Sequence, residues 1–271
     1  MKSHFSLGSR AAIACAVSSA AAMIPQVCSA QFAADYATAS AYADGWQAGD
    51  NGGYGFTPWS FSVTGGTPPQ WTMNSSSAYN QLGTAWAVYS ASGAEVVKAT
   101  RGFSAPLQPG QTVSITFDNP SGALMDYHGF AVGLLSSGVE RVSVWRYAYP
   151  WYWEGAGGNP YGQWQAGASS ALTTLTEAQT SQGVNLDITL TDPSTYALTM
   201  TPFGHPELAY SLAGPLAGSG GIDQLQFSFW GIPHLADGSG DFFISSMTIV
   251  PEPSTLALLG LGGLLFLPRR K

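Results

Sequence analysis

The chain has 271 residues, of which 45% are hydrophobic, 13% aromatic and only 9% charged, and its formal net charge is −7. So apolar a composition excludes an intrinsically disordered chain, and the acidic balance excludes nucleic-acid binding, which needs a basic face. Both cysteines, Cys15 and Cys28, precede residue 31. Disulfides, thiolate zinc sites and thiol catalysis are therefore excluded for the body that follows.

The N-terminal segment, 1–30, has the layout of a secretory signal peptide. Lys2 and Arg10 form a basic beginning, Ala11–Met23 is an apolar stretch, and Cys28-Ser29-Ala30 supplies small residues before a cut ahead of Gln31. We expect signal peptidase to remove this segment and the rest of the chain to be exported. The alternative interpretation of this segment is a first buried helix.

The body, residues 31–250, shows helical periodicity only at Ala33–Ala43 and Ser169–Thr180. Elsewhere short alternating runs are separated by Gly, Pro, Asn and Asp, which predicts strands. The predicted strands are Phe56–Val63, Ala85–Ser90, Glu95–Phe103, Thr112–Asp118, Gly129–Leu135, Glu140–Tyr149, Val184–Thr191, Thr195–Pro202, Leu208–Ala213, Ile222–Phe229 and Asp241–Val250. About eleven evenly spaced strands predict an all-β fold, a single antiparallel β-sandwich of the jelly-roll type.

Early in the body, Asp44, Asp50 and Asn51 form one group of oxygen-bearing side chains, and Asp118 and Asn119 form another. Oxygen ligands on loops suit Ca²⁺, so a structural Ca²⁺ is a candidate cofactor. The alternative is that these residues only make turns. No other metal site or cofactor is predicted, because the histidines are scattered without metal-ligand spacing.

The segment from Trp145 to Trp153 is strongly aromatic. If Val142 and Val144 face the core, Trp145 and Tyr147 lie on the opposite, outer face of the strand. Flat apolar rings with polar rims stack well on sugars. We therefore predict a glycan-contact platform made of Trp145, Tyr147, Trp151 and Trp153. The alternative is that these rings cover the core or a neighbouring subunit.

No catalytic signature is found in the body. Glycoside hydrolysis needs two carboxylates that flank one bond, whereas the glutamates are isolated: Glu95, Glu140, Glu154, Glu177 and Glu207. The sequence also lacks a nucleophile elbow and a phosphate-binding glycine loop. We therefore expect a protein that is not an enzyme.

The C-terminal segment, 251–271, has the order of a sorting signal. Pro251-Glu252-Pro253 comes first, the uncharged apolar run Leu256–Leu267 follows, and Arg269, Arg270 and Lys271 end the chain. As a helix this run spans about 18 Å, against about 30 Å of bilayer hydrocarbon. This is a short membrane span with its basic end in the cytoplasm. The alternatives are a plain tail anchor or a buried C-terminal strand.

This tail resembles the PEP-CTERM sorting signal of bacteria that make extracellular polysaccharide. The resemblance covers Val250–Ser254, the apolar run and the basic end. It implies that a membrane transpeptidase, exosortase, processes the protein. It also implies delivery to the cell surface or extracellular matrix, with only transient membrane anchoring by the tail.

A second resemblance covers most of the stretch 42–250. Tyr42–Trp59, Ala85–Tyr89, Arg101-Gly102-Phe103, Gly110–Asn119 and Gly221–Leu225 resemble a β-sandwich module of bacterial surface proteins, with a concanavalin-A-like or laminin-G-like architecture. The module has no assigned catalytic residues. The leading expectation is a non-enzymatic, exosortase-sorted surface protein that contacts extracellular polysaccharide. The alternatives are a polysaccharide hydrolase or lyase on the same fold, and a purely structural envelope protein.

Overall fold

The computed structural model describes residues 32–66, 70–78, 80–89, 95–118, 128–148, 164–166, 171–172, 175, 177–230, 238 and 240–251. At 128, 147–148, 164–166, 171–172 and 177–178 only the backbone is described. The predicted signal peptide, the tail beyond Pro251, and the aromatic residues Trp151 and Trp153 lie outside these ranges.

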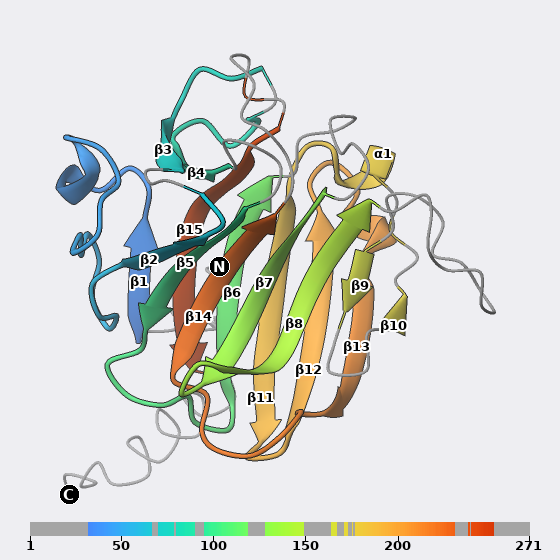
Figure 1. Cartoon of the computed structure of the whole chain (residues 1–271). Coiled ribbons are helices and arrows are strands. Elements are labelled where there is room, and N and C mark those ends of the chain that lie inside the picture. The colour runs from blue at the N-terminus through green and yellow to red at the C-terminus, as the bar shows by residue number, and fades with distance from the viewer. Residues whose placement is uncertain are drawn as a thin grey trace, which may run out of the picture.

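The described strands form two antiparallel sheets that stack on each other (Figure 1). The eight-stranded sheet has the order β13 (Tyr210–Pro215), β12 (Thr195–Pro202), β11 (Val184–Asp192), β6 (Gln111–Asp118), β15 (Phe242–Pro251), β4 (Ala85–Val88), β3 (Trp71–Asn74), and β1 (Ala33–Tyr36) also pairs with β15. The seven-stranded sheet has the order β10 (Ala171–Leu172), β9 (Trp164–Ala166), β8 (Val139–Ala148), β7 (His128–Ser136), β14 (Gln224–Trp230), β5 (Val96–Gly102), β2 (Ser60–Thr64). The short helices are η1 (Ser40–Tyr42), α1 (Glu177–Thr180) and η2 (Pro206–Leu208).

The core lies between the sheets and follows the two-residue period of the strands. In β6 the buried apolar residues are Val113, Ile115 and Phe117, and the partner strand β11 buries Leu186 and Ile188 beside them. The seven-stranded sheet contributes the inward residues of β7 and β14. Burying one such side chain stabilises the fold by about 1.5–3 kcal/mol. The predicted all-β sandwich is confirmed, although the ends of several strands differ from the predicted ones.

The helical expectation for Ala33–Ala43 is wrong, because Ala33–Tyr36 forms strand β1 and only Ser40–Tyr42 is helical. Ala33 pairs with Ile249 of β15, so sheet pairing overrides the helix propensity of alanine. The small side chains are needed for packing. A Cβ atom on Gly55 would lie 2.5 Å from the Cβ of Ala33, so neither position has room for a larger residue.

The helical expectation for Ser169–Thr180 holds only at its end. Glu177–Thr180 forms α1, whereas Ala171 and Leu172 pair with β9 as strand β10. Here, too, the neighbouring strand decides the backbone conformation, because pairing supplies hydrogen bonds that a lone short helix would have to make by itself.

One end of the sandwich, which we call the base, contains the start of the first described strand and the end of the last one. Ala33 pairs with Ile249, and Pro251, the last residue of β15, pairs with Gln111 (Figure 1). The β7–β8 turn and the β11–β12 turn reach the same end. The opposite end carries α1 and the ends of β8 and β14. The strands between the two ends are up to 10 residues long, which corresponds to about 30 Å.

Candidate functional site

The outer face of the seven-stranded sheet, the face turned away from the core, carries the first of the predicted platform residues. Val142 and Val144 of β8 are fully buried, and Trp145 is half-buried. Because neighbouring residues of a strand point to opposite faces, Trp145 lies on the outer face. Tyr147 pairs with Gly129 in the same register, and its side chain is outside the described part, as are Trp151 and Trp153.

Strand β7 presents small residues to this face as far as Gly133, and Leu135 follows, with its Cδ1 3.5 Å from where a Cβ on Gly133 would lie. Gly129, Ala131 and Gly133 alternate with residues of the core, and Ala131 pairs with Trp145. At the other side of β7, Trp230 of β14 pairs with Gly129. A Cβ atom on Gly129 would clash with Cζ2 of Trp230, so the indole lies over this glycine. Two half-buried indoles, from β8 and β14, thus flank the stretch 129–133 of β7, which has no large side chain on this face.

Polar side chains continue the face along β14 and β5. Gln226 pairs with Gly133. Its amide nitrogen donates to the hydroxyl of Thr100 at 2.9 Å, and its amide oxygen accepts from the hydroxyl of Ser228 at 3.1 Å. These bonds fix the orientation of the Gln226 amide. The face therefore offers ordered amide and hydroxyl groups beside the two indoles.

The charges that the described strands place on this face are few and exposed. Glu140 of β8 accepts a hydrogen bond from the hydroxyl of Ser143 at 2.6 Å and lies close to Gly133. Lys98 of β5 pairs with Ser228. A face with apolar rings, amides, hydroxyls and these two opposite charges suits a neutral polyhydroxylated ligand, which combines flat apolar faces with many hydrogen-bonding groups.

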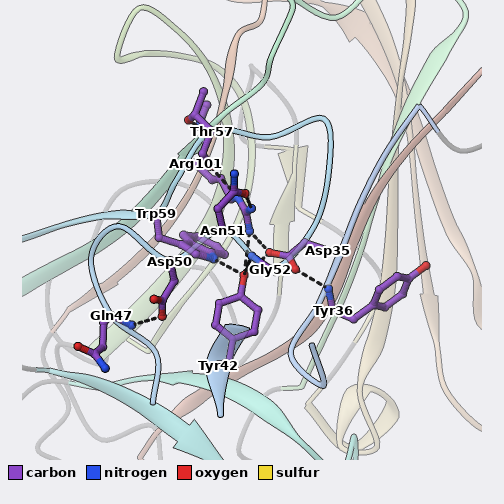
Figure 2. A network of polar contacts seen from close by, with 11 residues as sticks. Asp35, Tyr36, Tyr42, Gln47, Asp50, Asn51, Gly52, Thr57, Trp59 and Arg101 are labelled. Atoms are coloured by element: carbon purple, nitrogen blue, oxygen red, sulfur yellow. Dashed lines mark hydrogen bonds and ion pairs between the residues drawn. The ribbon is translucent and has the colours of Figure 1, made fainter. Parts of the chain in front are cut away.

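A separate polar network, buried at the side of the sandwich, has Tyr42 at its centre (Figure 2). The phenol oxygen donates to the carboxylate of Asp35. It accepts from Nη1 of Arg101 at 3.0 Å, from Nε1 of Trp59 at 3.1 Å and from the backbone N–H of Gly52 at 3.2 Å. Burial raises the pKa of Tyr42, and the hydrogen bond from Trp59 opposes this shift.

Arg101 links the two sheets within this network. Its guanidinium, fully buried in β5, forms an ion pair with Asp35 of β1, and Nε donates to the backbone carbonyl of Thr57 at 2.9 Å. The rings of Phe56 and Trp59 each lie 5.1 Å from its central carbon, which adds cation–π contact. Desolvation lowers the pKa of Arg101 to about 9. The neighbouring carboxylate favours the charged form, so the pair is ionised at neutral pH.

The first group of candidate calcium ligands belongs to this network. Asn51 accepts a hydrogen bond from Nη2 of Arg101, and the carboxylate of Asp50 accepts from the backbone N–H of Gln47 at 2.7 Å (Figure 2). Asp44 is exposed. A cationic guanidinium against the Asn51 oxygen opposes a bound cation there. Asn51 therefore does not fit a Ca²⁺ site and instead holds the loop onto the sandwich, whereas Asp50 bonds within the loop.

The second group gives no metal site within the described residues. Asp118 is buried at the end of β6, and its carboxylate accepts from the backbone N–H of Gln81 at 2.7 Å. Asn119 lies outside the described ranges. In the described part of the chain no three His, Cys, Asp or Glu residues are grouped so that they could hold a metal ion.

The sorting motif begins at the edge of the folded body. Pro251 is half-buried at the end of β15, whereas Glu252, Pro253 and the basic residues Arg269, Arg270 and Lys271 lie outside the described ranges. Among the residues described, no helix has the length and apolarity needed to span a bilayer. The apolar run Leu256–Leu267 lies beyond that part of the chain.

Comparison with known families confirms the tail prediction. Residues 250–271 match the PEP-CTERM protein-sorting motif. The fold and the tail together define the class of protein: an exported all-β sandwich protein that ends in a PEP-CTERM sorting signal. No curated protein sequence matches the chain.

Several solved structures are similar to the chain at low sequence identity. The Ca²⁺- and Man2-bound exoplasmic/lumenal domain of VIP36 has 11% identity and a TM-score of 0.45, over 73% of this chain and 82% of that domain. Lectin I-B4 from Griffonia simplicifolia, in its metal-free form, has 10% identity and a TM-score of 0.39, over 70% and 92%. A protein of unknown function from Shewanella oneidensis MR-1 has 13% identity and a TM-score of 0.39, over 71% and 78%.

Trp230 and the small residues of β7 were not predicted from the sequence. Trp230 lies far from Trp145 along the chain, and only the strand order places β14 beside β7. A signal was present, however. Gly129, Ala131 and Gly133 alternate with large apolar residues, a pattern that gives one large apolar face and one face with almost no side chains.

Proposed function

We propose that this protein is a non-enzymatic component of the cell surface or extracellular matrix that binds extracellular polysaccharide through the outer face of its seven-stranded sheet. Exosortase processes its tail, and signal peptidase removes the segment 1–30. The observation that carries the proposal is the pair of half-buried indoles, Trp145 and Trp230, on either side of the small residues of β7.

The spacing of the indoles supports a ligand that is longer than one sugar. Trp145 and Trp230 stand on β8 and β14, with β7 between them. Neighbouring strands are about 4.8 Å apart, so the backbones at Trp145 and Trp230 are about 10 Å apart across the sheet and about 7 Å apart along it. The Trp230 indole reaches from there over Gly129. A chain of two or three sugar units would cross β7 diagonally, with one ring on each indole. The hydroxyl of Ser228, at the level of Trp145, lies beside this path, and the ordered amide of Gln226 follows it along β14.

The acidic groups support binding rather than hydrolysis. Along the described outer face, Glu140 is a single exposed carboxylate with Lys98 as the opposite charge. A glycosidase places two carboxylates about 5–10 Å apart around the scissile bond. The buried carboxylates of Asp35 and Asp118 are engaged inside the structure, by Arg101 and by a backbone N–H, and do not reach this face.

The test uses residues 31–251 and the producing organism's own extracellular polysaccharide. Binding is measured by retardation in affinity electrophoresis and by tryptophan fluorescence. We expect Trp145→Ala and Trp230→Ala each to weaken binding at least ~10-fold, which corresponds to about 1.4 kcal/mol. Tyr54→Ala is the matched control, because Tyr54 is an aromatic residue that is 53% exposed in a different part of the molecule.

Each variant is first compared with the parent protein by circular dichroism and thermal unfolding. A folded Trp145→Ala or Trp230→Ala protein that binds as tightly as the Tyr54→Ala control would reject the proposed face. The double variant of Trp151 and Trp153 tests the remaining residues of the predicted platform. Release of reducing sugar during the binding experiment would favour the polysaccharide-active enzyme instead.

A further inference from the structure

The base of the sandwich lies close, along the chain, to the predicted membrane span. Pro251 is held in register against Gln111 at the end of β15, and the apolar run begins at Leu256. Only the segment 252–255 lies between them. Even fully extended, the steps from Pro251 to Leu256 cover at most about 18 Å.

This length limits how far the body can stand from the bilayer. The headgroup layer of one leaflet is about 5–8 Å thick, so less than roughly 13 Å remains between the base and the lipid surface. The body itself is about 30 Å long between its two ends. The apolar run is also shorter than the hydrocarbon thickness, and such a mismatch draws the flanking residues toward the membrane.

The N-terminal end of the described body lies at the same place. The backbone N–H of Phe32 donates to the carbonyl of Ile249 at 2.7 Å. A cut ahead of Gln31 would therefore leave the new N-terminus beside the strand that leads to the tail. Both ends that membrane enzymes process thus emerge from the base.

The surface of the base suits contact with the lipid interface. Phe32 is 42% exposed, and Val139, the first residue of β8 after the β7–β8 turn, is 64% exposed. Between the turns lies a hollow of about 310 Å³ whose lining includes Pro106, Pro109 and Pro193. Apolar groups give up no hydrogen bonds to water when they are brought against headgroups, so these residues do not oppose such contact.

We infer that the base is a membrane-facing surface: while the tail is in the bilayer, the base rests on the phospholipid headgroups and the opposite end points away. The sorting enzyme then approaches the chain from the membrane side, at residues beyond Pro251. This inference rests on the sorting tail and not on glycan binding, so the failure of either proposal leaves the other standing.

The experiment uses the full chain with Cys15→Ala and Cys28→Ala, so that one introduced cysteine can be labelled with a fluorophore. Val139→Cys places the label at the base, and Ala217→Cys is a second base position in an exposed loop. Thr64→Cys, exposed at the end of β2 opposite the base, is the matched control. The protein is reconstituted into phosphatidylcholine vesicles that contain a headgroup nitroxide lipid, and vesicle-bound protein is isolated by flotation.

We expect the nitroxide to quench both base labels several-fold and to leave the Thr64 label almost unquenched, because collisional quenching needs contact. Equal quenching at the two ends would overturn the inference, as would stronger quenching at Thr64. A full chain that does not float with the vesicles would also overturn it, because the tether would then be absent. Unchanged circular dichroism shows that each variant is folded.

Discussion

The phenol of Tyr42 provides the sharpest test of what holds the sandwich together. Tyr42→Phe keeps the ring and removes the oxygen that contacts Asp35, Gly52, Trp59 and Arg101. After the change, Nε1 of Trp59 loses the partner that the phenol supplies. Arg101 keeps its ion pair with Asp35 and its bond to the backbone carbonyl at position 57. Two donors, Nε1 of Trp59 and the backbone N–H of Gly52, therefore lose this acceptor, and two charged groups, Arg101 and Asp35, each lose one of several bonds.

The expected cost follows from these losses, of which the donor of Trp59 and the bonds of the two charged groups matter most. A buried donor that loses its partner costs about 1–3 kcal/mol, and a lost hydrogen bond to a charged group costs a similar amount. Because Arg101 keeps other partners, we expect the free energy of unfolding to fall by about 2–4 kcal/mol in total. For a body of this size each kcal/mol lowers the Tm by about 2–4 °C, so the Tm should fall by roughly 5–15 °C.

The assay is urea unfolding of residues 31–251, followed by tryptophan fluorescence, together with calorimetry for the Tm. Tyr54→Phe is the control, because the Tyr54 side chain is exposed and outside the network, and we expect less than about 0.5 kcal/mol for such a surface change. A loss below about 1 kcal/mol for Tyr42→Phe would refute the reasoning, since it would mean that the phenol does not hold the buried groups in place.

Three further outcomes are expected. Gly129→Ala should weaken polysaccharide binding and lower the free energy of unfolding by about 1–3 kcal/mol, because the new Cβ meets the Trp230 indole. Gly133→Ala is the control: the nearest neighbour of its new Cβ is at 3.4 Å, so binding and stability should change little. The raised pKa of Tyr42 means that the folded state prefers the neutral phenol. The stability that the neutral phenol confers is complete below the ordinary pKa of 10.0 and is lost as the pH rises through the pKa of the folded state. The Tm should therefore fall above about pH 10, and it should fall less in Tyr42→Phe. Intact-mass spectrometry of the processed protein should place its C-terminus at or after Pro251, and an end inside β15 would contradict the strand register.

Strand periodicity predicted most of the fold, because the core residues are apolar at every second position. Val113, Ile115 and Phe117 are an example: each is buried, as the alternation indicates. Strand β1 was missed because alanine favours helices when its partner strand is unknown. That partner, which contains Ile249, is the last described strand of the chain.

The candidate site was predictable only in part, for a similar reason. The outward direction of Trp145 follows from the buried Val142 and Val144, which is local information. Which strands become neighbours decides that Trp145 and Trp230 stand on either side of β7. How the sheets stack decides that Asp35 and Arg101 form an ion pair. Sequence periodicity carries no information on that order.

The position of β15 has a consequence for how the chain is assembled. This strand is the last one described, yet it lies in the interior of its sheet, where it pairs with β4, β6 and β1. During export the N-terminal residues cross first, and β1 must wait for the segment 242–251 before it finds its partner. The first strand to cross is thus among the last to pair, and such long-range pairing is slow. The eight-stranded sheet therefore cannot be completed until the segment 242–251 has crossed, and the sorting tail is the part of the chain that follows it.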